Sequence, residues 1–133
     1  MSQKNIELIL ATVGAYNAGN LDAWAEFLDA DIEVFPDASF PESSPLCGRD
    51  DYRAWTEQLA GGLLAPTWET REVIDLGVNR VLHRGDWGGK GEASGIETHS
   101  SIIGAFTVRD DRIARVEFYF DHDRALDAAG LSR

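Results

Sequence analysis

Cysteine is almost absent from this sequence, and so are long apolar runs. The single cysteine, Cys47, excludes an internal disulfide and fits a reducing cytoplasm. No stretch of about 18 apolar residues occurs, so we expect no membrane span. The N-terminal stretch MSQKNIELIL has no basic segment followed by an apolar one, which argues against a secretory signal. We therefore expect a cytoplasmic protein in which Cys47 is an ordinary loop thiol.

Positive charge and histidine are also scarce. Twelve lysines and arginines face 23 acidic residues, and the net charge is -11. A chain this acidic repels phosphates, which argues against binding to nucleic acids or to anionic membranes. The segment DHD at 121–123 has residue types that bind metals, but adjacent side chains diverge at a strand end and no second cluster accompanies them. We expect no metal and no cofactor, and we expect Asp121 to cap a final helix.

The first half of the chain has the apolar spacing of helices. This spacing predicts helices over 5–18, 21–31 and 48–62. A short strand over 31–35 and a proline-rich loop over 36–45 separate the second helix from the third. Gly19 suits the left-handed end of the first helix, and Asp50 suits the N-cap of the third.

The second half alternates with period two. This alternation predicts four successive strands and a closing helix, over 67–76, 79–89, 94–110, 112–120 and 121–131. Short turns between the strands imply antiparallel neighbours. Helices first and long strands later predict the α+β class, in one domain over 1–133. A curved, mostly antiparallel sheet wrapped around the N-terminal helices would form a cone-shaped α+β barrel with a hydrophobic pocket.

Several phrases in this order resemble one family. They are YNAGNLDAWAEFLDADIEVFP, CGRDDYRAW, SGIETHSSIIGAFTVRDDRIARVEFYFD and ALDAAGL. Together they resemble the SnoaL-like branch of the nuclear transport factor 2-like superfamily over nearly the whole chain. The resemblance implies the cone fold and a homodimer through the outer face of the sheet. It does not imply one activity, because this fold carries polyketide cyclases, ketosteroid isomerases, limonene epoxide hydrolases, dehydratases and non-catalytic binding proteins.

The resemblance also supplies a register for the isomerase site. The catalytic tyrosine, base aspartate and acid aspartate of the isomerases align with Thr12, Pro36 and Gly104. Pro36 and Gly104 have no ionisable side chain, which argues against steroid isomerisation by that mechanism. Many SnoaL-like relatives have a histidine at the position of Gly104, and that histidine is missing as well.

The same register predicts the wall of the pocket. The expected substrate-binding residues are Thr12, Tyr16, Val34, Trp55, Leu59, Ser100, Ile102, Phe106, Val116, Phe118 and Phe120. Thr98 and Gly104 are expected to face the hollow too. Most of this wall is apolar, which suits a hydrophobic or aromatic ligand. The alternative is that these side chains simply fill the core.

Arg84 and Asp86 are the candidate catalytic residues. They are two apart on a predicted strand, so both point the same way, and the register points them inward. Burying such a pair costs several kcal/mol per ion, a cost that is often accepted at functional sites. The alternative is a solvated pair before a glycine-rich hairpin, where an exposed pair contributes roughly 0–1 kcal/mol. His83 and His99 have the opposite parity and are expected to face outward unless a bulge reverses them.

The Arg-x-Asp spacing is similar to that of limonene epoxide hydrolases. The second aspartate of those enzymes falls at Phe118, and their water-holding tyrosine and asparagine fall at Val34 and Pro36. The water-activating base of a hydrolase therefore has no obvious counterpart.

Three functions remain open from the sequence. The first is a cofactor-independent enzyme that cyclises, isomerises or dehydrates an apolar or aromatic small molecule, such as a polyketide or terpene. In it Asp86 is the acid or base, Arg84 orients Asp86 or holds an oxyanion, and Tyr16 donates a hydrogen bond. The second is a non-catalytic binding protein for a small hydrophobic ligand, and the third an epoxide hydrolase. The expected dimer face carries Ile113, Arg115, Glu117 and Tyr119.

Overall fold

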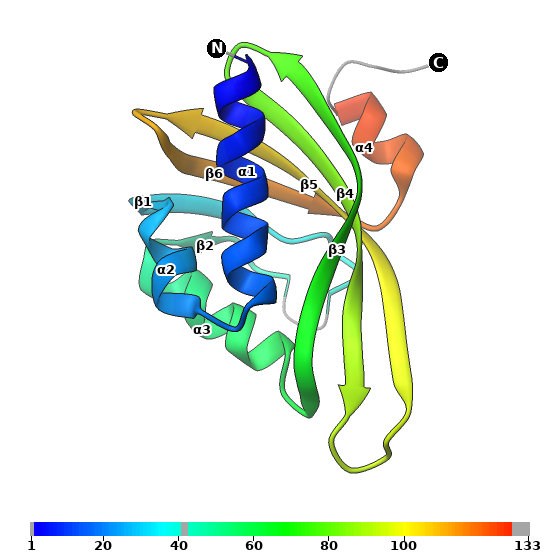
Figure 1. The fold of residues 1–133 in the computed structure, drawn as a ribbon. Coiled ribbons are helices and arrows are strands. Elements are labelled where there is room, and N and C mark those ends of the chain that lie inside the picture. The colour runs from blue at the N-terminus through cyan, green and yellow to red at the C-terminus, as the bar shows by residue number, and fades with distance from the viewer. Residues whose placement is uncertain (1, 41–42, 129–133) are drawn as a thin grey trace.

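The computed structural model describes residues 2–40 and 43–128 (Figure 1). The elements in chain order are α1 Ser2–Asn17, α2 Leu21–Glu26, β1 Leu28–Phe35, β2 Leu46–Cys47, α3 Arg49–Leu59, β3 Leu63–Gly77, β4 Arg80–Gly91, β5 Glu97–Arg109, β6 Arg112–Tyr119 and α4 His122–Ala128. No helix within the described residues is both long and apolar enough to cross a bilayer. Each predicted helix and long strand has a counterpart, but the second helix, predicted over 21–31, ends at Glu26 because β1 begins at Leu28. Residues 129–131 of the predicted final helix lie outside the described residues. The two-residue strand β2 has no counterpart in the sequence prediction.

The six strands form one curved sheet in the order β2-β1-β6-β5-β4-β3. Neighbouring strands are antiparallel except β1 and β6, which run parallel. Helix α1 lies along one face of the sheet, where it contacts β3 and β4, and α4 packs on the other side against β5 and β6 (Figure 1). The α+β class and the cone of a curved, unclosed sheet with N-terminal helices across one face are therefore confirmed.

Alternate residues of β3, β4, β5 and β6 belong to two separate cores. Ile102 of β5 packs in the large core between the sheet and the N-terminal helices, whereas Ile103 packs in a small core with Leu82 and Ala125 of α4. The period of two in the sequence thus places one residue under the helices and the next under α4. The face under the N-terminal helices is called the inner face below, and the face under α4 the outer face.

The prediction that Ile113 belongs to the dimer face is wrong, because β6 contains a bulge. Thr107 pairs with Arg115 but Val108 pairs with Ile113, so Ala114 is an extra residue in the ladder. The extra residue reverses the parity, and Ile113 is fully buried in the inner core. Ile113 therefore does not belong to the outer face. Arg115, Glu117 and Tyr119, which follow the bulge, have the opposite parity to the inward Val116 and Phe118.

The helix ends agree with the sequence in two places of three. Gly19 has φ 74°, the left-handed conformation expected after α1. Asp121 caps α4, because its Oδ1 accepts the backbone N–H of Asp123 at 2.9 Å. Asp50 is not the cap of α3. The helix begins at Arg49 after Gly48, so the Asp50 carboxylate lies in the first turn, where the helix dipole favours it.

Candidate functional site: an aromatic pocket

A pocket opens in the inner face between α1, α2, α3 and the sheet. Its described lining residues are Thr12, Val13, Tyr16, Trp24, Leu28, Phe40, Tyr52, Trp55, Thr56, Leu59, Trp68, Trp87, Ile102, Phe106 and Phe118. Nine of these fifteen side chains are aromatic, and all four tryptophans of the chain are among them. None of the fifteen is a carboxylate, an imidazole or a cation. The polar groups that face this space are therefore hydroxyls and indole N–H groups.

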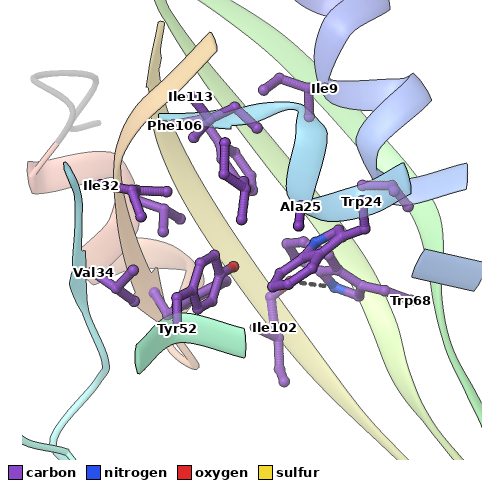
Figure 2. Packing of buried hydrophobic residues seen from close by; sticks show 14 of the residues in the cluster. Ile9, Trp24, Ala25, Ile32, Val34, Tyr52, Trp68, Ile102, Phe106 and Ile113 are labelled. Atoms are coloured by element: carbon purple, nitrogen blue, oxygen red, sulfur yellow. Dashed lines mark hydrogen bonds between the residues drawn. The ribbon is translucent and has the colours of Figure 1, made fainter. Parts of the chain in front are cut away.

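The pocket is small. Its volume is about 60 Å³. One water needs roughly 10–15 Å³ on this scale, so the space holds roughly four to six groups of that size. Aromatic rings crowd around it, and Figure 2 shows Trp24, Trp68 and Tyr52 converging from three different elements. A flat, apolar group fits such a space better than a branched or charged one.

Trp68 of β3 forms one wall because two glycines leave room for its ring. A Cβ at Gly85 would lie 2.9 Å from Trp68 Cδ1, and a Cβ at Gly104 would lie 3.1 Å from Trp68 Cη2. The indole N–H of Trp68 donates to the backbone oxygen of Ile102 at 3.2 Å (the dashed line in Figure 2). Asn17, at the end of α1, holds the Trp68 backbone with one hydrogen bond in each direction, of 3.1 and 2.7 Å. The absence of a side chain at Gly104 thus leaves space for the Trp68 ring.

Helix α3 supplies Tyr52, which sequence reasoning missed. Tyr52, Trp55, Thr56 and Leu59 are spaced i, i+3, i+4 and i+7, so they share one helix face and all four line the pocket. The Tyr52 hydroxyl points toward the centre of the core (Figure 2) and makes no hydrogen bond to another described residue. Burial raises the pKa of the Tyr52 hydroxyl, and so does the nearby Tyr16. The hydroxyl is therefore a neutral donor whose proton has no acceptor among the described side chains.

Tyr16 and Trp87 meet at the pocket wall. The indole N–H of Trp87 on β4 donates to the hydroxyl oxygen of Tyr16 on α1 at 2.7 Å. Burial raises the pKa of Tyr16, and the bond from Trp87 offsets only part of this rise. The Tyr16 hydroxyl keeps its proton at neutral pH and can still donate it to a ligand.

The prediction that Arg84 and Asp86 face the pocket is wrong. On β4, Gly85 pairs with the pocket residue Ile102, whereas Arg84 pairs with Ile103 of the outer core. Paired residues of adjacent strands share a face, so Arg84 and Asp86 lie on the outer face.

The two charges are bound to β3 rather than to each other. Arg84 Nε lies 3.3 Å from Glu72, and Asp86 lies 2.7 Å from Arg71 Nε. About a third of each side chain remains exposed. This is the solvated alternative, which avoids the desolvation of two ions.

The predicted register of β4 is shifted by one residue, so the expectation that His83 faces outward is also wrong. His83 is fully buried on the inner face, against the edge of Trp68 at 4.2 Å between ring centroids. Its Nε2 lies 2.9 Å from the Thr70 hydroxyl. Burial lowers the pKa of His83 to about 4, so the ring is neutral at pH 7. Trp68 lies between His83 and the pocket, which His83 does not line. His99 is half exposed and lies 3.6 Å from Glu97.

Strand β5, and β6 after its bulge, have the predicted parity, but not every predicted residue reaches the pocket. Seven of the eleven predicted substrate-binding residues line it, namely Thr12, Tyr16, Trp55, Leu59, Ile102, Phe106 and Phe118. Val34 and Val116 are fully buried in the core beside it, and Phe120 packs on Phe40 at 4.6 Å between centroids. Ser100 is exposed, as is Thr98. On β5 these two residues pair with Trp87 and Gly89 of β4.

Eight lining residues lie outside the sequence prediction, namely Val13, Trp24, Leu28, Phe40, Tyr52, Thr56, Trp68 and Trp87. The helical spacing around Trp55 was sufficient to find Tyr52 and Thr56. Phe40 lies in the proline-rich loop, whose sequence has no period.

For metals, the described residues contain no group of three or more histidine, cysteine or acidic side chains placed to hold an ion.

The sequence comparison shows the family of this chain. The sequence model of the SnoaL-like domain matches residues 9–116, which is most of the chain. The chain belongs to the SnoaL-like family. No protein of curated function matches its sequence.

Solved structures share the fold at low identity. Bal32a, from a soil-derived mobile gene cassette, is 16% identical with a TM-score of 0.79, and the alignment covers 96% of each chain. A putative SnoaL-like polyketide cyclase from Jannaschia sp. CCS1 is 17% identical with a TM-score of 0.77, over 100% of this chain and 95% of that one. TerC, co-crystallised with polyporic acid, is 19% identical with a TM-score of 0.74, over 96% and 98%. At these identities the likeness concerns the fold.

Proposed function

We propose that this SnoaL-like protein binds a small, neutral aromatic molecule in the aromatic pocket, with a carbonyl oxygen of the ligand accepting a hydrogen bond from Tyr52. The observation that carries this proposal is the Tyr52 hydroxyl, a neutral donor without a described partner inside an apolar, ring-lined space. A ligand that covers this hydroxyl without offering an acceptor leaves the donor unsatisfied, which costs ~1–3 kcal/mol. A ligand that supplies the acceptor recovers this free energy and gains the burial of its own ring.

Matched ligands test the proposal. Acetophenone and α-methylstyrene have nearly the same shape, but only the ketone can accept a hydrogen bond. The four indole N–H signals in a nitrogen-edited NMR spectrum report on the pocket, because every tryptophan lines it. Titration with acetophenone should shift these signals. Tyr52→Phe should weaken acetophenone about five- to tenfold, the value of one hydrogen bond, and leave α-methylstyrene unchanged.

Tyr119→Phe is the control variant, since this tyrosine lies outside the pocket lining. It should change the affinity for neither ligand. Indole signals that do not move at millimolar acetophenone would refute binding. Equal weakening of both ligands by Tyr52→Phe would refute the hydrogen bond.

A catalytic role is the second candidate, supported by the two phenols. Tyr16 and Tyr52 both line the pocket and both remain neutral donors. Two such donors can stabilise the oxyanion of an enolate, as cyclisation or isomerisation of a carbonyl compound requires. The relative named as a putative polyketide cyclase supports this class of substrate. No described lining residue is a base, so the carbon acid must lose its proton to water, and epoxide hydrolysis is not proposed.

Deuterium exchange tests the catalytic candidate. A 1,3-diketone in D₂O should exchange its central protons faster with the protein than without it. Tyr52→Phe should reduce the added rate about a hundredfold if the phenol holds the oxyanion. Asp86→Asn should leave the rate unchanged, because Asp86 is on the outer face. An exchange rate equal to that of buffer leaves binding as the function.

Dimerisation through the outer face stays a prediction. The relevant surface carries Arg115, Glu117 and Tyr119, with ion pairs of Arg115 to Glu33 and Glu117. Light scattering at micromolar concentration should give the mass of two chains. The mass of one chain would contradict it.

A further inference from the structure

A second hollow adjoins the aromatic pocket where α1 and α3 end and β3 begins. It shares Tyr16 and Thr56 with the pocket, so these two side chains form a boundary between the two spaces. Its volume is about 310 Å³ against about 60 Å³ for the pocket. We call it the outer compartment. A ligand in the pocket that is larger than one ring meets this space first.

Small side chains keep the outer compartment open. Ala18, Gly19, Ala60 and Ala65 line it from three different elements or their ends. Each of these residues has at most one side-chain carbon. None of these four residues lines the aromatic pocket, so larger apolar residues at these positions would reduce the volume of the outer compartment first.

A bulge at the start of β3 forms one side of the compartment. The β3–β4 register shifts between Leu64 and Thr67, which takes Ala65 and Pro66 out of the ladder. Ala65 has φ 44°, a left-handed conformation that costs a residue with a Cβ ~1–2 kcal/mol. Gly89 of β4 lies directly beneath, since a Cβ there would be 2.9 Å from the Leu64 oxygen. Such strain persists where the surrounding structure enforces it, often beside a binding site.

The charge of the outer compartment favours neutral ligands. Glu57 is the one charged residue among its described lining. Its potential partner, Arg53, is 3.9 Å away and is already bonded to Asp22 at 2.8 Å. With a net charge of -11 on the whole chain, an anionic group here meets repulsion without a free cation beside it.

We propose that the outer compartment is a second subsite of the aromatic pocket and that the ligand is a neutral, elongated molecule. One ring enters the pocket past Tyr16 and Thr56, and the remaining, mostly apolar part lies against Ala18, Ala60 and Ala65. This inference rests on the function proposed above and extends it from a single ring to a molecule of at least two rings. The hydrogen bond from Trp87 fixes the position of the Tyr16 ring at the boundary between the two subsites.

Three ketones of increasing size and charge test the subsite. They are acetophenone, 4-acetylbiphenyl and the 4′-carboxylate of 4-acetylbiphenyl, each titrated while the indole N–H signals are followed. The protein should bind 4-acetylbiphenyl at least about tenfold more tightly than acetophenone, because the second ring gains apolar burial. The carboxylate should bind at least about tenfold more weakly than 4-acetylbiphenyl.

Two variants on different elements locate the second ring. Ala60→Leu and Ala18→Leu should each weaken 4-acetylbiphenyl about tenfold or more and leave acetophenone within about twofold. Ala11→Leu, the same exchange at an exposed position of α1 outside both linings, should change neither ligand. Since Ala18 is exposed, Ala18→Leu should keep the fold even if Ala60→Leu does not.

The outcomes separate the two proposals. Acetophenone that binds while 4-acetylbiphenyl binds no more tightly overturns the second subsite and leaves the proposed function standing. Equal losses of both ligands in both alanine variants also overturn the subsite. A carboxylate that binds as tightly as its neutral parent overturns the neutral ligand class. If none of the ketones moves an indole signal, the proposed function fails and the subsite fails with it.

Discussion

The indole nitrogen of Trp87 lies 2.7 Å from the hydroxyl oxygen of Tyr16, although the two residues are 71 positions apart. This bond joins α1 to β4 at the boundary of the pocket. It uses the acceptor capacity of Tyr16 and leaves its proton free for a ligand. The same contact therefore supports the fold and leaves a hydroxyl donor at the boundary of the pocket.

Loss of this bond should lower stability in a way that a double-mutant cycle can isolate. Tyr16→Phe leaves the Trp87 N–H without its acceptor and should cost ~1–2 kcal/mol of unfolding free energy. Trp87→Phe in the Tyr16→Phe background should then cost less than it does alone, with a coupling of ~1 kcal/mol. Urea denaturation of the four proteins gives this value. The control cycle of Tyr16→Phe with Tyr119→Phe should show no coupling. If the Tyr16–Trp87 cycle also shows none, this hydrogen bond does not contribute to stability.

Glycine at 104 should be required by packing rather than by backbone conformation. A Cβ there would lie 2.8 Å from Phe106 Cε2 and 3.1 Å from Trp68 Cη2, so Gly104→Ala should lower the unfolding free energy by ~1–3 kcal/mol. Gly14 on α1 is the control, because a Cβ there meets nothing within 4 Å. Gly14→Ala should instead raise stability by ~0.5–1 kcal/mol, as alanine favours the helix. Equal effects of the two exchanges in urea titrations would contradict the packing of Trp68 over Gly104.

The sequence predicted the pocket best where the alternation is unbroken. Ile102, Phe106 and Phe118 follow their strands with period two and line the pocket as expected. Ile113 follows the same rule in the sequence, but the bulge at Ala114 turns it inward. No local pattern marks such an extra residue, because its position depends on how two strands align in three dimensions.

The error on β4 has a different cause. The simplest interpretation of Leu82, Arg84 and Asp86 places the two charges toward water, since burying both costs several kcal/mol each. The register taken from the family overrode this interpretation and was wrong by one residue. His83 was misplaced for the same reason. Physical cost was the better guide here than alignment of a glycine-rich strand.

His83 should make stability depend on pH above the range in which carboxylates titrate. Its pKa is about 4 in the folded chain, because burial disfavours the charged ring, against 6.5 in the unfolded chain. Between these values the unfolded state binds more protons, so stability falls as pH falls from 6.5 to 4. The shift corresponds to at most ~3 kcal/mol. The loss of stability begins near pH 6.5 and is complete below the folded pKa of about 4, where the ring is charged in both states.

Thermal melts from pH 7 to pH 4 check this prediction. His83→Gln should flatten the decline in melting temperature across that interval, and the half-exposed His99→Gln should leave the decline as in the parent chain. An unchanged decline in His83→Gln would show that the buried ring is not its source.

Asp37 should control stability in a lower pH window and hold the C-terminal helix. Its side chain is 1% exposed. Oδ1 accepts the backbone N–H of Ser39 at 2.8 Å, and Oδ2 accepts that of Phe120 at 3.3 Å. Arg124 Nη1 lies 3.6 Å from Oδ2. Burial alone would raise the pKa of Asp37, but these bonds and Arg124 outweigh burial and lower it. A folded pKa below the unfolded one gives stability that is present above pH 4 and is lost as pH falls below it. This window begins where that of His83 ends.

Asp37→Asn should cost ~1–3 kcal/mol at pH 7, because an amide group replaces one of the two acceptor oxygens beside the N–H of Ser39 or Phe120. Amide hydrogens of α4 should exchange faster, since Phe120 and Arg124 connect that helix to the loop that carries Asp37. Asp111→Asn is the control, because the pair of Asp111 with Lys4 is exposed and such pairs contribute roughly 0–1 kcal/mol. The two variants should also differ in acid, where only Asp37→Asn flattens the loss of stability below pH 4. If both aspartates behave alike, the carboxylate at 37 does not anchor α4, and the hold on that helix must come from the outer core of Leu82, Ile103 and Ala125.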